Sequence, residues 1–293
     1  MTSTSSLFDS GIEAVHRRSA LRPLRRAGRA CLNPAALFVI LVVIGATFAG
    51  SLSGHGPNDQ NLQARFAPPS REYFLGTDAL GRDTFTRILY GARISLATAI
   101  SAALLSTFLG AILGLLAGYL GGIVDSVVSY VSDVVMAFPA IIFALFILSV
   151  FGSDMKNVII ALAVYGVPGA FRVVRGQVLV IRELEYVKAS VSVGASPLRT
   201  AVRHVLPNSI APLTVAVPLA MSGAVLAEAG LSFLGLGVRP PTPTWGGMLA
   251  DGYAFIYDHP RLPIIPGIAV FLLVLSLNAI GDQVRAALSH RRS

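Results

Sequence analysis

Six long stretches of the chain contain no Asp, Glu, Lys or Arg, and this feature restricts the possible folds more than any other. They are residues 35–52, 94–124, 134–153, 157–171, 205–227 and 262–281. A helix that crosses a bilayer needs about 20 mainly apolar residues. The fourth stretch is shorter, but Arg172 and Arg175 can extend it by reaching toward the interface. The sequence therefore predicts an all-α membrane protein with six transmembrane helices.

Composition supports the membrane prediction and excludes a soluble or disordered chain. Hydrophobic residues make up 54% of the chain and charged residues 13%, about half of the ~25% charged residues in soluble domains. The mean hydropathy is +0.70. The net charge of +8 is explained by basic loops at the cytoplasmic face, so nucleic acid is not an expected partner.

The distribution of Lys and Arg predicts the side on which each loop lies. If the N-terminus is cytoplasmic, 15 of the 23 Lys and Arg residues fall on the cytoplasmic side, as the positive-inside rule requires. We therefore expect cytoplasmic tails at 1–33 and 286–293, flanking a transmembrane domain at 34–285. Its main loops are 53–92 and 231–261 outside and the basic loop 182–207 inside. The expected location is the cell membrane, with several crossings.

The cytoplasmic loop carries the clearest local pattern. The stretch from Glu185 predicts a helix that ends at Gly194, a residue suited to the left-handed backbone of a helix C-terminus. Ser196 is a favourable N-cap, and Pro197 fits the first position of a second helix. Pro207 is expected to end that helix. Two short helices joined by a fixed bend are therefore predicted at the cytoplasmic face.

This segment resembles the cytoplasmic EAA loop of ABC importer permeases. The matching residues are Lys188-Ala189-Ser190, Gly194 and His204-Val205-Leu206-Pro207. Lys188 stands where the family has Glu, and Ser190 where it has Ala. The resemblance implies that Glu185 to Gly194 docks in a cleft of an ATPase subunit, while His204 and Pro207 hold the shape of the loop. The alternative is a basic loop that binds lipid headgroups.

Further motifs resemble the dipeptide, oligopeptide and nickel branch of that family. They are LGTDALGRD at 75–83, AEAGLSFLGLG at 227–237, PPTPTWG at 240–246 and GDQVR at 281–285. Within the branch, the chain is similar to the "C" permease member. The resemblance implies a prokaryotic permease subunit that forms, with a homologous sister permease, the translocation path for dipeptides or oligopeptides. It also implies two cytosolic ATPase subunits that bind ATP and Mg, and an extracytoplasmic substrate-binding protein.

The chain carries no motif for catalysis of its own. A P-loop requires a Lys that follows its glycines, and neither Lys156 nor Lys188 fits that pattern. The sequence also lacks a Gly-x-Ser-x-Gly elbow and a His or Cys spacing typical of metal sites. We therefore expect a non-catalytic subunit that has no metal or cofactor and depends on separate ATPases.

Two acids and three glycines inside the apolar runs suggest close helix contacts. An ionised acid in lipid costs about 2.5 kcal/mol or more, so Asp133 is expected to face the bundle interior, either bonded to a neighbouring helix or in the translocation path. Glu228 either anchors the loop that follows it or contacts a cationic end of the substrate. Gly110, Gly114 and Gly118 permit close approach of another helix, in this subunit, in the path or in the sister permease.

The outside loops are candidates for contact with the receptor. The pattern at 85–89 predicts a short amphipathic helix in the interface plane, with Asp78 or Asp83 as its N-cap. With the 231–261 loop, this helix is expected to form a receptor platform, unless both segments are only interfacial anchors. The candidate receptor-facing residues are Asp78, Arg82, Asp83 and Trp245.

Three alternatives remain open at this stage. The first is the same kind of importer with another cargo, such as nickel chelates or another small solute. The second is an independent secondary transporter or channel, although inverted repeats and broken helices are not evident in the sequence. The third is a membrane scaffold, which would not need an ATPase-docking loop.

Overall fold

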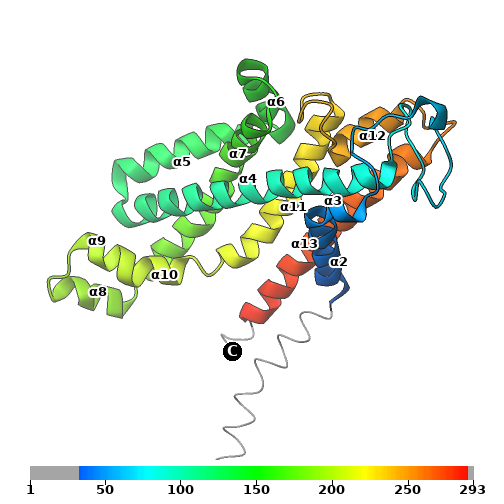
Figure 1. The fold of residues 1–293 in the computed structure, drawn as a ribbon. Coiled ribbons are helices and arrows are strands. Elements are labelled where there is room, and N and C mark those ends of the chain that lie inside the picture. The colour runs from blue at the N-terminus through cyan, green and yellow to red at the C-terminus, as the bar shows by residue number, and fades with distance from the viewer. Residues whose placement is uncertain (1–32, 290–293) are drawn as a thin grey trace, which may run out of the picture.

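A computed structural model describes residues 33–289, and this part of the chain is built from helices and turns (Figure 1). Its only β-type pairing is one isolated bridge between Thr77 and Asp83. The elements are α2 (Pro34–Thr47), α3 (Ala49–Leu52), η1 (Leu62–Ala64), α4 (Thr84–Leu120), α5 (Gly122–Ala137), α6 (Ala140–Phe151), α7 (Met155–Ile181), α8 (Glu185–Ser192), α9 (Pro197–Thr200), η2 (Ala201–Val205), α10 (Leu206–Ser209), α11 (Leu213–Phe233), α12 (Trp245–Tyr253) and α13 (Arg261–Ser289). All six predicted apolar stretches are mainly helical, with breaks at 48, 121, 138–139 and 210–212, so that the fifth stretch is divided between α10 and α11.

Four of the described helices are long and apolar enough to cross a membrane alone: α4, α7, α11 and α13. The pair α5 and α6 has the composition of a fifth crossing. The first apolar stretch forms α2, which has 14 residues, and continues after a break at Phe48 into α3. The helical nature of the six stretches is therefore confirmed, while the count of six crossings stays a prediction.

The third apolar stretch differs from the expected straight helix. α5 and α6 meet at an angle of 95°, and the bend falls at Phe138 and Pro139, both of which have extended backbone. Proline disfavours helical backbone in the residue before it and has no N–H for the helix. Pro139 therefore ends one helix and starts the next.

Long helices cross one another in the centre of the molecule, where α4 runs beside α7 and α11 (Figure 1). Three clusters of buried side chains hold them together. The first joins α2, α4, α11, α12 and α13, and the second joins α4, α6, α7 and α11. The third lies between α7, α8, η2 and α11, so it attaches the cytoplasmic segment to the bundle.

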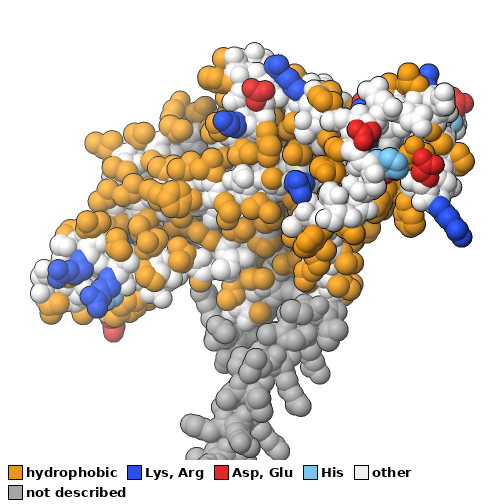
Figure 2. All heavy atoms as spheres, viewed as in Figure 1, with side chains coloured by type: hydrophobic (Ala, Val, Ile, Leu, Met, Phe, Trp, Pro, Cys, Tyr) orange, Lys and Arg blue, Asp and Glu red, His pale blue; other side chains and the backbone are white. Residues whose placement is uncertain are grey.

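The two polar ends lie far apart along the molecule. Figure 1 places α8, α9 and α10 at one end and α12 with the 53–83 loop at the other. On the face in Figure 2, hydrophobic side chains cover the region between these ends, and most charged side chains lie at the ends. This distribution suits a chain whose centre lies in an apolar environment such as lipid.

Three predicted boundaries need correction. Residues 85–89 do not form a separate interfacial helix, because they are the first turns of α4. The 231–261 loop contains the nine-residue helix α12. α13 continues to Ser289 and therefore enters the predicted tail at 286–293. Nearly all of the predicted tail at 1–33 and residues 290–293 lie outside the described residues.

Candidate functional site

The cytoplasmic segment has the local geometry that its sequence predicts, with one exception. Gly194 follows α8 with a φ of +85°, and the Ser196 side chain accepts a hydrogen bond from the backbone N–H of Arg199 at the start of α9. Pro207, however, does not end a helix. A π-helical turn at η2, in which the N–H of Leu206 bonds to the carbonyl of Ala201, leads directly into α10. Pro207 therefore lies within a continuous helical run from Pro197 to Ser209.

α8 has one anchoring residue and an exposed apolar face. Val187 is 2% exposed and packs in the cluster that includes Val178, Val205 and Leu213. Other large apolar side chains on this segment point away from the bundle. They are Tyr186, Val191, Val193, Leu198 and Val202, with exposures from 46% to 85%. The segment is therefore fixed to the bundle on one side and presents an uncovered apolar surface on the other.

The charge of Lys188 is balanced inside the segment. Its ammonium lies 3.0 Å from the Glu183 carboxylate. The hydrogen bond from Lys188 holds the pKa of the Glu183 carboxyl below its ordinary value. Glu185 and Ala189 are exposed, and the Ser190 hydroxyl lies 3.5 Å from that of Thr200, which links α8 to α9.

His204 joins two turns of the segment. Its ring contacts the Tyr186 ring edge-on at 6.3 Å between centroids. The Asn208 amide donates to the backbone carbonyl of His204 at 2.7 Å and lies 3.4 Å from the Tyr186 hydroxyl. These contacts suit a residue that holds the loop in shape.

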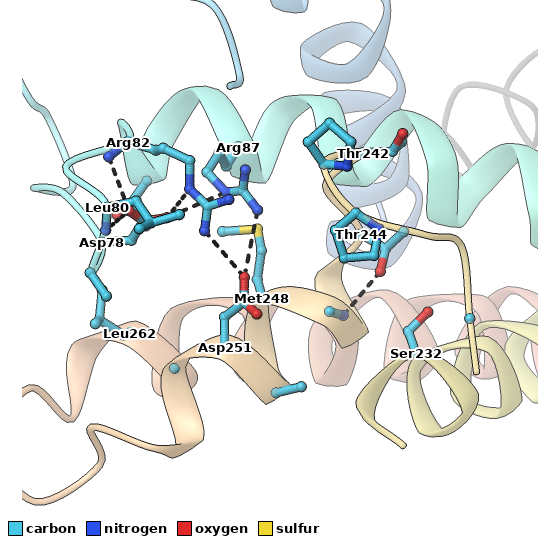
Figure 3. Close-up of a pocket in the computed structure, with 18 of the residues that line it drawn as sticks. Asp78, Leu80, Arg82, Arg87, Ser232, Thr242, Thr244, Met248, Asp251 and Leu262 are labelled. Carbon is cyan, nitrogen blue, oxygen red and sulfur yellow. Dashed lines mark hydrogen bonds and ion pairs between the residues drawn. The ribbon is translucent and has the colours of Figure 1, made fainter. Parts of the chain in front are cut away.

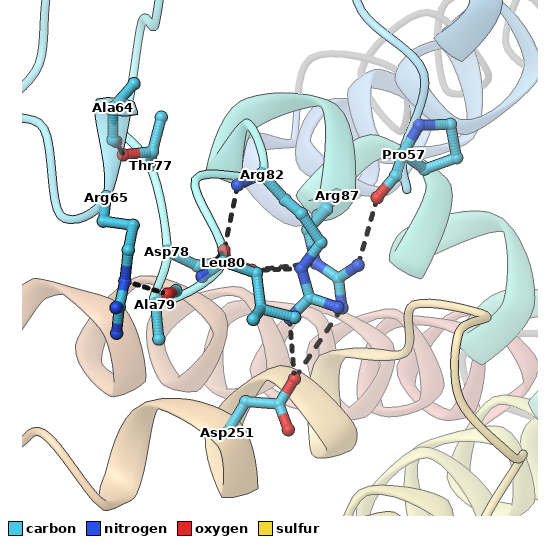
Figure 4. A network of polar contacts seen from close by, with 10 residues as sticks. All are labelled: Pro57, Ala64, Arg65, Thr77, Asp78, Ala79, Leu80, Arg82, Arg87 and Asp251. Atoms are coloured by element: carbon cyan, nitrogen blue, oxygen red, sulfur yellow. Dashed lines mark hydrogen bonds and ion pairs between the residues drawn. The ribbon is translucent and has the colours of Figure 1, made fainter. Parts of the chain in front are cut away.

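At the opposite end, a network of ion pairs lines one side of a cavity (Figure 3). The Arg82 guanidinium lies 2.6 Å from Asp78 and 3.2 Å from Asp251. Arg87 lies 3.7 Å from Asp78 and 3.8 Å from Asp251, and it donates to the Pro57 carbonyl (Figure 4). The network thus joins the 53–83 loop, α4 and α12.

The four predicted receptor-facing residues lie inside this end and not on its surface. Asp83 is 5% exposed and caps α4 by accepting from the backbone N–H groups of Phe85 and Thr86. Of the two predicted N-caps, Asp78 and Asp83, the structure therefore uses Asp83. Trp245 is 1% exposed, and its indole donates to the Ile88 carbonyl. Since Arg82 and Asp78 are also largely buried, these residues shape the outer surface without forming its contact face.

Asp133 pairs with a neighbouring helix at the surface of the chain. Its carboxylate lies 2.6 Å from Arg172 of α7, and the side chain is 64% exposed, so the expected position in the bundle interior is wrong for the isolated subunit. Asp125 accepts from Arg175 at 2.7 Å and makes a second α5–α7 pair. Because half-exposed charges avoid lipid, this seam requires water or another protein beside it.

Glu228 is fully buried between α11 and α4. It accepts hydrogen bonds from Ser95 of α4 at 3.1 Å and from Ser232, one turn further on α11, at 2.7 Å. These two bonds join α11 to α4, while the predicted anchoring of the following loop stays a prediction.

The three glycines of α4 face α7 of the same subunit. A Cβ at Gly110 would lie 2.5 Å from Ala170, and one at Gly114 would lie 2.8 Å from the Phe171 carbonyl oxygen. One at Gly118 would lie 2.9 Å from Val178. Of the predicted alternatives, the structure places this close approach within the subunit.

A second cavity, of about 480 Å³, lies among the long helices. Its walls come from α4, α7 and α11 together with the bend between α5 and α6. Most of its lining residues are Ala or Gly, including Gly169, Gly223 and Ala220, and none is charged. Small uncharged walls leave room for a solute or for another subunit.

Sequence reasoning missed several residues that hold these regions together. Arg87, Asp251 and Arg261 were not singled out, although Arg261 donates to the carbonyls of Phe66 and Ala67 in the outer loop. A basic residue inside the first turns of an apolar helix was the available signal for Arg87. Among the described residues, no group of three or more His, Cys, Asp or Glu could hold a metal ion.

Comparisons with known proteins all match this chain to membrane components of transport systems. The family described as binding-protein-dependent transport system inner membrane component matches residues 110–293. A Brucella suis biovar 1 (strain 1330) protein, named as a peptide transport system permease, is 42% identical over 255 residues, 87% of this chain and 86% of the relative. The glutathione transport system permease protein GsiD of Escherichia coli O1:K1 / APEC is 40% identical over 258 residues, 87% of this chain and 84% of the relative.

Among solved structures, a methionine transporter shares the fold. It is the MetNI methionine ABC transporter in an inward facing conformation, with a TM-score of 0.54 and 21% identity over 68% of this chain and 95% of that chain.

Proposed function

We propose that small peptides are the cargo of this chain, which belongs to the binding-protein-dependent transport system inner membrane components. As a member of this family, the chain is a permease subunit of an ABC importer in the inner membrane. Relatives at 40–42% identity are named for peptide and glutathione transport, which supports this cargo. The cavity of small, uncharged residues among α4, α7 and α11 suits a solute that is not held by charge. Nickel chelates and other small solutes are the competing cargoes.

The uncovered apolar face of the cytoplasmic segment is the observation that carries the rest of the proposal. Val193 and Leu198 are 85% and 74% exposed, and an ATPase subunit is the partner expected to cover them. Two such subunits would bind ATP and Mg, and ATP-driven closure would move this segment. The path, shared with a sister permease, would then switch from inward-facing to outward-facing. An extracytoplasmic substrate-binding protein would deliver the peptide to the opposite end.

Purification of the tagged chain from native membranes in mild detergent tests these partners. We expect mass spectrometry to find a homologous permease and two ATPase subunits, with the receptor retained in part. The identity of that receptor then reports the cargo. A chain that purifies alone, or only with copies of itself, would contradict the importer assembly and favour an independent transporter.

Replacing Gly223 with leucine should obstruct transport without disturbing the fold. Gly223 lines the small-residue cavity, and a Cβ built on it meets no atom within 4 Å, so the added side chain enters open space. We expect peptide uptake to fall roughly tenfold, equivalent to ~1.4 kcal/mol in the limiting barrier. Uptake by reconstituted vesicles, measured with radiolabelled peptide, gives the result.

Gly176→Leu is the matched control for that variant. Gly176 also has open space beside it but does not line the cavity. Equal uptake by the two variants would show that the cavity is not part of the path.

A further inference from the structure

The outer cavity is large enough to hold a small solute. It has a volume of about 420 Å³, within the range of small-molecule sites. Its walls are the end of the 53–83 loop, the start of α4, the 235–244 segment and α12 (Figure 3). Apolar residues, including Val238, Met248 and Leu262, line this space together with Arg82 and Arg87.

The two arginines are fixed in position by groups that cannot easily leave. Arg82 and Arg87 are 8% and 4% exposed. Asp78 is held by the backbone N–H groups of Leu80 and Arg82 and by the Arg82 guanidinium. The Pro57 carbonyl holds Arg87 from the other side. Two guanidinium groups are therefore presented in a fixed geometry that suits a carboxylate.

Asp251 is the one member of this network that is free to leave. Its side chain is 58% exposed, and its carboxylate lies 3.2 Å from Arg82 and 3.8 Å from Arg87 (Figure 4). Because the Asp251 carboxylate reaches the two buried arginines from the solvent side, an incoming carboxylate can approach from that side and replace it. The exchange keeps two negative groups beside two positive groups, and no buried charge is left unpaired.

We propose that this cavity binds the free carboxylate of a small peptide, which displaces Asp251 from Arg82 and Arg87. The inference rests on the proposed peptide cargo and assigns the outer cavity as a transient subsite on the receptor side of the permease. The apolar residues that line the same cavity contact the body of the peptide. An uncharged peptide end cannot replace the Asp251 carboxylate, so the subsite selects a free C-terminus.

Binding to the receptor-free importer tests this proposal. The complex of the full chain with its co-purified subunits, in lipid nanodiscs, is titrated with alanyl-alanine and with its C-terminal amide, and saturation-transfer NMR reports bound peptide. We expect the free acid to bind more tightly than the amide. Asp251→Asn removes the competing carboxylate and should lower the dissociation constant of the free acid by about two- to fivefold, with no gain for the amide.

Asp258→Asn is the matched control, because Asp258 is exposed just beyond α12 and does not line the cavity. It should leave both dissociation constants unchanged. Equal affinities for acid and amide, no detectable binding of either, or no response to Asp251→Asn would each overturn the subsite. The same complex, reconstituted into closed vesicles and supplied with its receptor, gives a separate measurement of peptide uptake. Normal uptake there, without peptide binding in the nanodiscs, rejects the subsite and leaves the importer function intact.

Discussion

Replacing Gly110 with alanine is expected to destabilise the subunit, although alanine is the better helix former. The added Cβ would lie 2.5 Å from the Ala170 Cβ and 2.8 Å from backbone atoms of Val167 and Phe171. Backbone atoms cannot move aside unless α4 and α7 separate. A gain of about 0.5–1 kcal/mol from helix propensity is therefore outweighed by an overpacking cost of about 1–3 kcal/mol. The thermal midpoint of the solubilised importer, from size-exclusion chromatography after heating, should fall.

Gly110→Leu should leave only a small fraction of the subunit folded. Its larger side chain should lower the free energy of unfolding by roughly 3 kcal/mol or more. The control is Gly176→Ala on α7, where an added Cβ meets no atom within 4 Å. That variant should be as stable as the original or slightly more stable. If Gly110→Ala raised the thermal midpoint as well, the close contact between α4 and α7 would be wrong.

The features predicted correctly from the sequence are those set by neighbouring residues. A charge-free run specifies a helix because the backbone of a membrane segment must satisfy its own hydrogen bonds. The left-handed Gly194, the Ser196 cap and the Asp83 cap likewise depend on a few adjacent residues. The bend at Pro139 had a local signal, but one proline does not fix an angle of 95°.

The features that could not be predicted depend on contacts between distant parts of the chain. Arg82 and Asp251 are 169 residues apart, and Trp245 bonds to a carbonyl 157 residues away. Apolar patterning does not specify which outer loop folds over which helix. Trp245 was therefore expected at the surface although it is buried. Asp133 shows the opposite error, because it was expected in the bundle interior and instead pairs with Arg172 at the surface of the chain.

Replacing Val187 with aspartate is expected to separate ATP hydrolysis from transport. Val187 is 2% exposed and fixes α8 in the cluster with Val178, Val205 and Leu213. An ionised carboxylate cannot remain in that cluster, so α8 would detach from the bundle. We expect the ATPase subunits to stay bound and to hydrolyse ATP, while peptide uptake falls by roughly tenfold or more. Reconstituted vesicles allow both rates to be measured on one preparation.

The contrasting variant is Val193→Asp, on the exposed face of the same segment. Val193 is 85% exposed, so its replacement leaves the attachment to the bundle intact and places a charge where the ATPase is proposed to dock. This variant should lose the ATPase subunits during purification, whereas Val187→Asp should retain them. If Val187→Asp imported peptide at the original rate, the attachment of α8 to the bundle would not transmit motion. If both variants lost the ATPase equally, the division into an anchoring face and a docking face would fail.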